Sequence, residues 1–291
     1  MTATEWTTAP TDLLAVERYS GSGVVPGVDL AAIDPHGTPG FDGDKKAGKQ
    51  LLADVSDELS ALQEKLFAAS RGGGDTRSVL LVLQGMDTSG KGGIVRHVVG
   101  AVDPQGVAHY AFKAPTPEEL EHDFLWRVRR ALPGAGLIGV FDRSHYEDVL
   151  ITRVHGTDAD TIEERYAQIR AFEEELHAAG TTVIKVMLHI SRTEQKERLA
   201  ERLDRPDKYW KYNPGDVDER LLWPAYQEAY GLALANTSTE DAPWFVVPAD
   251  RKWYARLAVQ GLLLHTLRSL DLSWPDADFD VAEEKARLAA S

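Results

Sequence analysis

Two short motifs in this sequence carry residue types suited to the transfer of phosphate groups. The first is a glycine-rich run from Gly85 to Gly92 that contains Asp87 and Lys91. Glycines let backbone N–H groups close around phosphate oxygens, and a lysine offers them a mobile positive charge. The spacing of Gly85, Gly90 and Lys91 fits the first seven positions of the phosphate-binding pattern G-x-x-x-x-G-K. We therefore predict that this loop binds phosphate.

The eighth position of the loop departs from that pattern. Gly92 stands where a serine or threonine hydroxyl would normally hold magnesium, and Asp87 places a carboxylate inside the loop. A carboxylate there would repel phosphate unless a cation lay between them. We infer that Asp87 binds the metal or orients an acceptor phosphate through it. The alternative is a glycine-rich turn without a ligand, which the apolar strand and helix patterns on either side disfavour.

The second motif follows the apolar run from residue 137 to residue 141. It reads Asp142-Arg143-Ser144-His145-Tyr146. In phosphate-loop proteins a carboxylate at the end of such a strand holds magnesium or its water shell, and the planar guanidinium of Arg143 is suited to clamping a phosphoryl group. A simpler role for Asp142 is to cap the following turn. The nearby phosphate loop favours the metal role.

A mixed-charge segment spans residues 192–211. Its seven basic and five acidic side chains give it a net charge of +2, in a chain whose formal net charge is −14. By their spacing, Arg198, Arg202 and Arg205 share one helix face, which Lys208 and Lys211 extend. This face is suited to line a groove for a linear polyanion. A solvated helix with Glu-to-Arg pairs four residues apart explains the composition equally well.

Composition limits the remaining possibilities. The 291 residues are 43% hydrophobic and 27% charged, as expected for a soluble globular protein. The absence of cysteine excludes disulfides, thiol catalysis and thiolate metal sites, and it fits the cytoplasm. The net charge argues against nucleic-acid binding. Neither a secretory signal nor an apolar run of membrane-spanning length is present, so we expect no membrane partner.

The two motifs must be positioned by alternating strands and helices. The expected strands are residues 79–83, 107–112, 137–141, 182–190 and 244–247, and the expected helices are residues 41–70, 94–99, 115–132, 161–179, 192–203, 216–234 and 251–270. Such alternation predicts an α/β fold with a parallel sheet covered on both faces. Ligands of these sheets bind at the carboxyl ends of the strands, where both motifs fall.

Several motifs in this order resemble the polyphosphate kinase 2 family. They are Gln84–Gly93, Phe112–Pro115, His122–Arg127, Phe141–Glu147, Lys208–Lys211, Thr237–Thr239, Ala242–Trp244 and Pro248–Trp253. The resemblance covers about residues 10–270. It implies a P-loop NTPase-like, three-layer α/β/α kinase domain over residues 41–270, with a helical lid at about 192–220. Residues 1–40 would form an extended N-terminal arm and residues 271–291 a C-terminal tail.

The resemblance also implies a reaction and its partners. The family transfers phosphate between inorganic polyphosphate and a nucleotide, uses magnesium, with manganese as a substitute, and forms homo-oligomers. For this chain it implies adenine or guanine nucleotides as substrates and a homodimer or homotetramer. The spacing of Asp103–Gly106 and His122–Arg127 is similar to that of the subgroup, class III, that accepts both nucleoside mono- and diphosphates.

Roles for individual residues follow from the same resemblance. Asp87 and Asp142 would hold the metal, and Lys91 and Arg143 the transferred phosphoryl group. The residues expected to contact the nucleotide or its phosphates are Gly85, Met86, Thr88, Ser89, Gly90, Gly92, Lys113, Asp123 and Glu147. Those expected to bind polyphosphate are Arg198, Arg202, Arg205, Lys208 and Lys211.

Two other functions remain open from the sequence. One is an ATP-dependent nucleoside monophosphate kinase of the thymidylate kinase type, whose loop would normally carry a serine or threonine at Gly92 and would not need Asp87. The other is a nucleotide-binding regulator without turnover.

Overall fold

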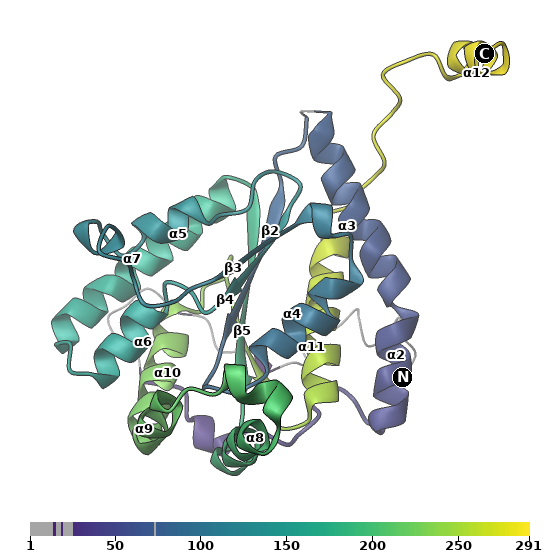
Figure 1. Ribbon diagram of the computed structural model, residues 1–291. Helices are drawn as coiled ribbons and strands as arrows, with labels where there is room; N and C mark the ends of the chain where they lie inside the picture. Colours follow the sequence, from purple (N-terminus) through teal and green to yellow (C-terminus); the bar gives the residue numbers. More distant parts are fainter. Residues whose placement is uncertain (1–13, 16–18, 20–25, 73) are drawn as a thin grey trace.

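The computed structural model describes residues 14–15, 19, 26–72 and 74–291, whose strands form one six-stranded sheet (Figure 1). In spatial order these are β1 (Leu14–Ala15), β6 (Trp244–Pro248), β5 (Thr181–His189), β2 (Ser78–Gln84), β4 (Ile138–Asp142) and β3 (Val107–Ala111). Strands β2 to β6 run parallel to their neighbours, whereas β1 pairs antiparallel with β6. The predicted parallel sheet is confirmed.

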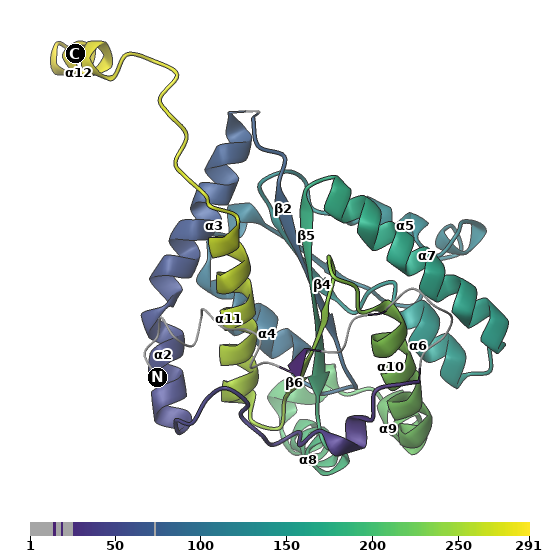
Figure 2. The same cartoon turned by 180° about the vertical axis from the view of Figure 1, so that it is seen from behind.

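Helices cover both faces of this sheet (Figures 1 and 2). On one face lie α2 (Lys45–Asp54), α3 (Ser56–Arg71), α4 (Lys91–His97) and α11 (Lys252–Ser269); on the other lie α5 (Trp126–Arg130), α6 (Glu147–Val154), α7 (Ala159–Ala178) and α10 (Trp223–Thr237). At the carboxyl edge lie α8 (Arg192–Asp204), the 3-10 helix η6 (Pro206–Lys211) and α9 (Gly215–Leu221). Shorter 3-10 helices are η2 (Leu30–Ala32), η3 (Val99–Ala101), η4 (Pro104–Gly106) and η5 (Glu119–Glu121). The three-layer α/β/α prediction is confirmed.

Residues 79–83 of the central strand β2 are all apolar because helices cover both faces of the sheet. Its side chains alternate between the two faces of the sheet. Val79, Leu81 and Leu83 belong to the core under α3, α4 and α11. Leu80 and Val82 belong to the core under α6, α7 and α10. All five are fully buried, and this burial fixes the register that delivers the phosphate loop to the carboxyl edge.

The segments at the two ends of the described chain differ in how far they contact the layers. Residues 26–40 pack against this chain: Val28 N donates to Gly231 O at 3.0 Å, and Asp250 N donates to Pro35 O at 3.1 Å. Most of residues 1–25, where the rest of the predicted arm falls, lie outside the described residues. At the other end, α12 (Val281–Ala289) stands away from the main body in both views.

Some predicted helices have different bounds. The helix expected over residues 41–70 divides at Val55 into α2 and α3, and the helix expected over 216–234 divides at Leu222 into α9 and α10. Helix α6 was not predicted. Among the described residues no helix is both long enough and apolar enough to span a bilayer.

The prediction of a continuous helix over residues 115–132 was wrong. Only η5 and α5 form there. The Asp123 carboxylate accepts a hydrogen bond from Leu125 N at 3.0 Å, and Asp123 O accepts one from Trp126 N at 3.0 Å. An aspartate that satisfies nearby backbone donors in this way favours a turn over a helix.

A buried ion pair links β5 to the second motif. Lys185 Nζ donates to Glu173 Oε2 at 2.6 Å and to Tyr146 OH at 3.0 Å, and Tyr146 OH donates to Glu173 Oε1 at 2.8 Å. Burial opposes the ionised form of Glu173, but Lys185 and His145 bring its pKa below the usual value. These contacts anchor the motif that carries Arg143 to the centre of the sheet.

Removing one charge of this pair should destabilise the protein strongly. We expect Lys185→Met to lower the free energy of unfolding by about 3–5 kcal/mol, because it leaves the Glu173 carboxylate buried without its cation. The double variant Lys185→Met/Glu173→Gln should recover much of that loss, since it removes both charges and keeps an acceptor for Tyr146. Urea denaturation measures both values. Equal destabilisation of the single and double variants would contradict an ionised pair.

Candidate active site

The two predicted motifs meet at the carboxyl edge because β2 and β4 are neighbours. Leu83 pairs with Asp142 in their register, and Arg143 N donates to Leu83 O at 3.0 Å. The phosphate loop leaves β2 at Gly85 and enters α4 at Lys91. Adjacent parallel strands thus bring together side chains that are more than fifty residues apart in the sequence, as the strand order predicts.

Two loop glycines have backbone conformations that other residues adopt with strain. Gly85 has φ of +147° and Gly90 has φ of +118°. A Cβ at Gly85 would also lie 2.7 Å from Leu188 O. The loop conformation therefore requires glycine at both positions.

Lys91 is folded back into the loop. Its Nζ donates to Gly85 O at 2.7 Å and lies 3.5 Å from Met86 O. Burial lowers the pKa of Lys91 and the Arg143 charge lowers it further, while the carboxylates of Asp87, Asp142 and Glu147 oppose the shift. A lysine, an arginine and three carboxylates therefore influence one another at the end of the sheet.

Asp87 and Arg143 form an ion pair across the two motifs. Arg143 Nη2 donates to Asp87 Oδ1 at 2.8 Å. Burial opposes the charge on Arg143, but Glu147 and Asp87 raise its pKa above the usual value. Arg143 has a left-handed backbone with φ of 63°, and Thr88 in the loop has φ of 64°. Such strain in non-glycine residues persists where surrounding contacts enforce it, often at functional sites.

The turn that holds Arg143 is fixed by buried hydrogen bonds. Gln84 Nε2 donates to Ser144 Oγ at 3.1 Å, and Tyr146 N donates to the same oxygen at 3.2 Å. Glu147 follows at the start of α6, where burial raises the pKa of its carboxyl group and Arg143 opposes that shift. Gln84 and Ser144 thus connect the end of β2 to the second motif.

The Arg198 guanidinium is fully engaged with the protein. Its Nε donates to Glu194 Oε1 at 2.7 Å, and its Nη1 donates to Thr88 O at 2.9 Å and Ser89 O at 3.0 Å. Its Nη2 donates to Ala249 O at 2.6 Å and Asp250 O at 3.0 Å. These contacts use all five donors of a guanidinium. Arg198 therefore joins α8, the phosphate loop and the segment after β6.

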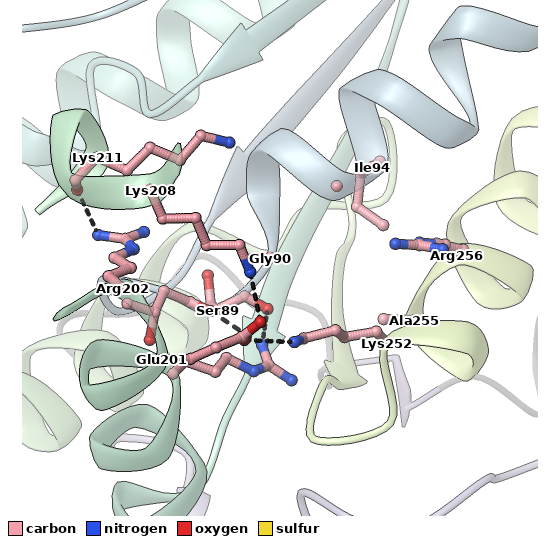
Figure 3. Close-up of a pocket in the computed structure, with 13 residues that line it drawn as sticks. Ser89, Gly90, Ile94, Glu201, Arg202, Lys208, Lys211, Lys252, Ala255 and Arg256 are labelled. Carbon is pink, nitrogen blue, oxygen red and sulfur yellow. Dashed lines mark hydrogen bonds and ion pairs between the residues drawn. The ribbon is translucent and has the colours of Figure 1, made fainter. Parts of the chain in front are cut away.

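One pocket, which we call the lid pocket, lies between the phosphate loop, α8, η6 and α11 (Figure 3). Its volume is about 190 Å³, and Arg198, Arg202, Lys208 and Lys211 line it, as the sequence places them together. Arg205 does not line this pocket; it is exposed and pairs with Asp207. The remaining lining residues are Thr88, Ser89, Gly90, Gly93, Ile94, Glu201, Lys252, Ala255 and Arg256.

Most cations of the lid pocket already have a polar or aromatic neighbour. Lys208 pairs with Glu201, and Lys252 Nζ lies 3.8 Å from the same carboxylate. Arg202 Nη1 donates to Lys211 O at 2.8 Å and to an Asp216 carboxylate oxygen at 3.3 Å. Lys211 Nζ lies 4.8 Å from the centre of the Trp210 ring, which is 78% exposed.

A second pocket, which we call the α10 pocket, includes the Asp87–Arg143 pair in its lining. Its volume is about 260 Å³. Its lining residues are Met86, Asp87, Arg143, Glu147, Ile151, Gln195, Asn213, Gly215, Asp216, Glu219, Arg220, Tyr226 and Tyr230. Tyr226 OH donates to Glu219 Oε2 at 2.6 Å, and burial raises the pKa of both Tyr226 and Tyr230 above the usual tyrosine value. One phosphate loop therefore borders two pockets.

Four predicted contact residues line neither pocket: Gly85, Gly92, Lys113 and Asp123. The catalytic candidate Lys91 also lines neither. Lys113 and Asp123 follow β3; Lys113 O accepts from Arg127 Nη1 at 2.9 Å, and Asp123 caps its own turn. Gly92 is exposed in the first turn of α4. Asp142 lines neither pocket, although its charge acts on Lys91.

The sequence reading missed residues that helices bring in from a distance. Lys252 and Arg256 lie four residues apart on α11, so they share a helix face. Asp216 and Tyr226 reach the α10 pocket from α9 and α10. One feature could have identified these residues from the sequence: each of their helices begins near the carboxyl edge of the sheet, where ligands bind.

The residues around Lys91 fit magnesium only in combination with a substrate. Among the described residues no group of three or more histidine or acidic side chains would hold a metal by itself. Magnesium usually takes one or two carboxylates and completes its coordination with substrate phosphates and water. Asp87 and Asp142 supply that kind of oxygen, and Asp87 Oδ1 is the atom already paired with Arg143.

Because Arg198 acts through its fork of donors, a lysine should not replace it. We expect Arg198→Lys to lower kcat/KM about tenfold or more and stability by about 2 kcal/mol, since several buried carbonyl groups lose their donor. Arg205→Lys is the matched control and should change both values little, because Arg205 is exposed and lines neither pocket. Steady-state kinetics and thermal unfolding test this. Equal behaviour of the two variants would show that charge alone matters at position 198.

The sequence of this chain is similar to those of proteins from one known family. The family model "Polyphosphate kinase 2 (PPK2)" matches residues 42–273. The chain is 44% identical to an AMP/ADP-polyphosphate phosphotransferase of Meiothermus ruber over 258 residues, covering 88% of this chain and 94% of the relative. It is 43% identical to an ADP-polyphosphate phosphotransferase of Rhodopseudomonas palustris, over 78% of this chain and 81% of the relative.

A solved structure gives the same result. The fold superimposes on a crystal structure of polyphosphate kinase 2 from Arthrobacter aurescens TC1 with a TM-score of 0.92 and 56% sequence identity, covering both chains completely.

Proposed function

The chain belongs to the polyphosphate kinase 2 family, and we propose that it transfers phosphate reversibly from inorganic polyphosphate to AMP, ADP or both. The observation that carries this proposal is the single phosphate loop bordered by two pockets. A reaction between two phosphate anions needs a site for each of them and a shared place where they meet. The names of the relatives support polyphosphate and adenine nucleotides as the two partners.

The lid pocket is our proposed site for polyphosphate. Cations from α8 and η6 line it beside the loop: Arg202, Lys208 and Lys211. A linear polyanion has no base or sugar to recognise, so a groove of cations is the recognition it requires. The residues from about 192 to 220 would act as the lid over it.

The α10 pocket is our proposed site for the nucleotide. It combines Tyr226, Tyr230 and Ile151, which offer apolar surface to a base, with Arg143 near the loop, which suits the phosphates. Its carboxylates, Asp87 and Glu147 among them, would repel a nucleotide phosphate. A divalent cation bound with the nucleotide would remove that repulsion. We therefore propose that the nucleotide enters with magnesium, or with manganese in its place.

The chain's own residues would act by orienting and neutralising phosphate. In the proposed complex Lys91 leaves its contact with Gly85 O and binds the oxygens of the transferred group, while loop amides bind the same group. Arg143 lines the α10 pocket and is held by Asp87 and Glu147, so it can bind a phosphate oxygen of the nucleotide. Asp87 and Asp142 would hold the metal, which supplies positive charge between the two anions when it is bound.

Two finer statements are also proposals. We expect the protein to act in the cytoplasm, as the absence of cysteine suggests. We further expect a homo-oligomer, a dimer or a tetramer.

The direct test is ATP formation without added ATP. Purified protein with ADP, or with AMP in a parallel reaction, should make product only when polyphosphate and magnesium are both present, and EDTA should abolish it. Asp87→Asn and Lys91→Ala should each lower kcat about a hundredfold or more while the protein stays folded. Asp160→Asn, exposed at the start of α7, is the control and should be unaffected.

The results of this assay also distinguish the proposed function from the two alternatives that the sequence leaves open. Phosphorylation of AMP only when ATP is supplied would indicate a nucleoside monophosphate kinase. Nucleotide binding without product under any condition would indicate a regulator. Full turnover by Asp87→Asn would refute the metal role of that residue.

The pH profile should report Glu147. Burial raises the pKa of its carboxyl group, and its ionised form helps to hold Arg143. As the pH falls, protonation of Glu147 should begin above the range of an exposed glutamate and lower kcat/KM. Glu147→Gln should be slower at neutral pH and should lack this acid limb. Ionisation of the substrates affects the wild-type protein and Glu147→Gln equally. An identical acid limb in their two profiles would therefore show that Glu147 is not the titrating group.

A further inference from the structure

Three basic side chains extend from the lid pocket along α4 and α11. Arg256 lines the pocket from α11, and Figure 3 shows its side chain reaching toward Ile94 on α4. Its Nη2 would lie 3.8 Å from a Cβ built at Gly93. Arg96 and His97 lie three and four residues after Gly93, on the same side of α4 and one turn further from the loop. We call Arg96, His97 and Arg256 the outer cluster.

The charges of Arg96 and Arg256 repel each other, whereas His97, whose pKa is lowered, is largely uncharged at neutral pH. After burial, the strongest influence on the pKa of Arg256 is the charge of Arg96, which lowers it. Burial, then Arg256 and Arg96, lower the pKa of His97. In the part of the chain that the structure describes, neither arginine has a carboxylate oxygen within 4.0 Å. Arg96 and Arg256 thus lack the acidic partners that neutralise the cations deeper in the pocket.

The inner cations of the lid pocket are neutralised to a greater degree. Glu201 is close to both Lys208 and Lys252, and Asp216 contacts Arg202. The donors of Arg198 are all used within the protein. An incoming polyanion therefore gains less by reaching the inner cations, which must first exchange a partner, than by reaching the outer cluster.

We propose that Arg96, His97 and Arg256 form an outer subsite for the part of the polyphosphate chain that trails behind the transferred unit, so that the enzyme favours long chains over short ones. This inference rests on the proposed function and assigns a chain-length preference to it. From Lys91 to His97 a helix rises by about 9 Å. A long chain lying along α4 can reach that distance, whereas tripolyphosphate has only two units behind the one transferred.

The proposal differs from a purely structural role for these residues. Arg96 and His97 lie in the last turn of α4, where positive charges stabilise a helix. Arg256 lies on another helix and enters the pocket, which that role does not explain. A structural role would change stability without distinguishing one donor from another, so the length of the donor separates the two explanations.

The test compares donors of different length. Steady-state kinetics of Arg96→Ala/Arg256→Ala would be measured with long-chain polyphosphate and with tripolyphosphate, at saturating ADP and magnesium. KM for the long chain should rise about five- to tenfold, because the variant removes two positive charges that contact its trailing units. KM for tripolyphosphate, KM for ADP and kcat should each change by less than about twofold.

Controls keep the result interpretable. Arg96→Lys/Arg256→Lys keeps both charges and should restore the long-chain KM, even if the alanine variant is less stable by thermal unfolding. Arg129→Ala/Arg130→Ala removes the same charge from α5 on the opposite face of the sheet and should change neither KM. In the alanine variant at positions 96 and 256, the long-chain KM should also depend less steeply on salt.

Three results would overturn the inference. An unchanged long-chain KM would show that the outer cluster does not touch the donor. Equal increases for both donors would show a general effect of charge rather than an outer subsite. A rise in the KM for ADP alone would assign the cluster to the nucleotide. If the wild-type protein makes no ATP from any polyphosphate, the proposed function itself fails, and that result is distinct from these three.

Discussion

The interaction on which the site depends is the set of hydrogen bonds from the Arg198 guanidinium to backbone carbonyl groups. Thr88 and Ser89 supply two of these carbonyls, and Ala249 and Asp250 supply the others. The same side chain ties α8, the first helix of the proposed lid, to the loop. Arg198 therefore stabilises both the conformation of the phosphate loop and the position of α8.

The second constraint is electrostatic. A chain with a net charge of −14 has to bring two anions together, and it does so with cations that are already partly compensated. Arg143 is paired with Asp87, and Lys91 is bonded to a loop carbonyl. Such pairing keeps buried charges from being isolated in the absence of substrate. Phosphate oxygens can then replace these partners, so that substrate binding exchanges one set of charge contacts for another.

Sequence reasoning succeeded where chemistry is local. The apolar run of β2, the loop glycines Gly85 and Gly90, and the carboxylate that ends β4 each follow from neighbouring residues. The rule that ligands bind at the carboxyl ends of parallel strands then placed both motifs at one edge. It failed where a side chain's role depends on distant partners. Arg198 shares a helix face with Arg202, yet it is saturated by carbonyl groups from two other segments.

The α10 pocket could not be read from the sequence for the same reason. Tyr226 and Tyr230 lie in an apolar helix whose sequence is equally suitable for a buried core. The packing of α10 against α6 and α7 places them in the wall of this pocket. The 115–132 segment shows the opposite error, because its helical pattern is overridden by the local hydrogen bonds of Asp123. Tertiary context decides both cases, as it does for most weak propensities.

The lid gives these two pockets a physical connection. Arg202 on α8 donates to Lys211 O, and Lys211 lines the lid pocket; the same Arg202 nitrogen donates to Asp216, which lines the α10 pocket. Burial and the nearby charge of Asp87 raise the pKa of Asp216, so its carboxylate depends on the cations around it. Phosphate that draws Arg202 toward the lid pocket would weaken that support and alter the wall of the other pocket. A single arginine thereby makes the electrostatic state of each pocket sensitive to the occupant of its neighbour.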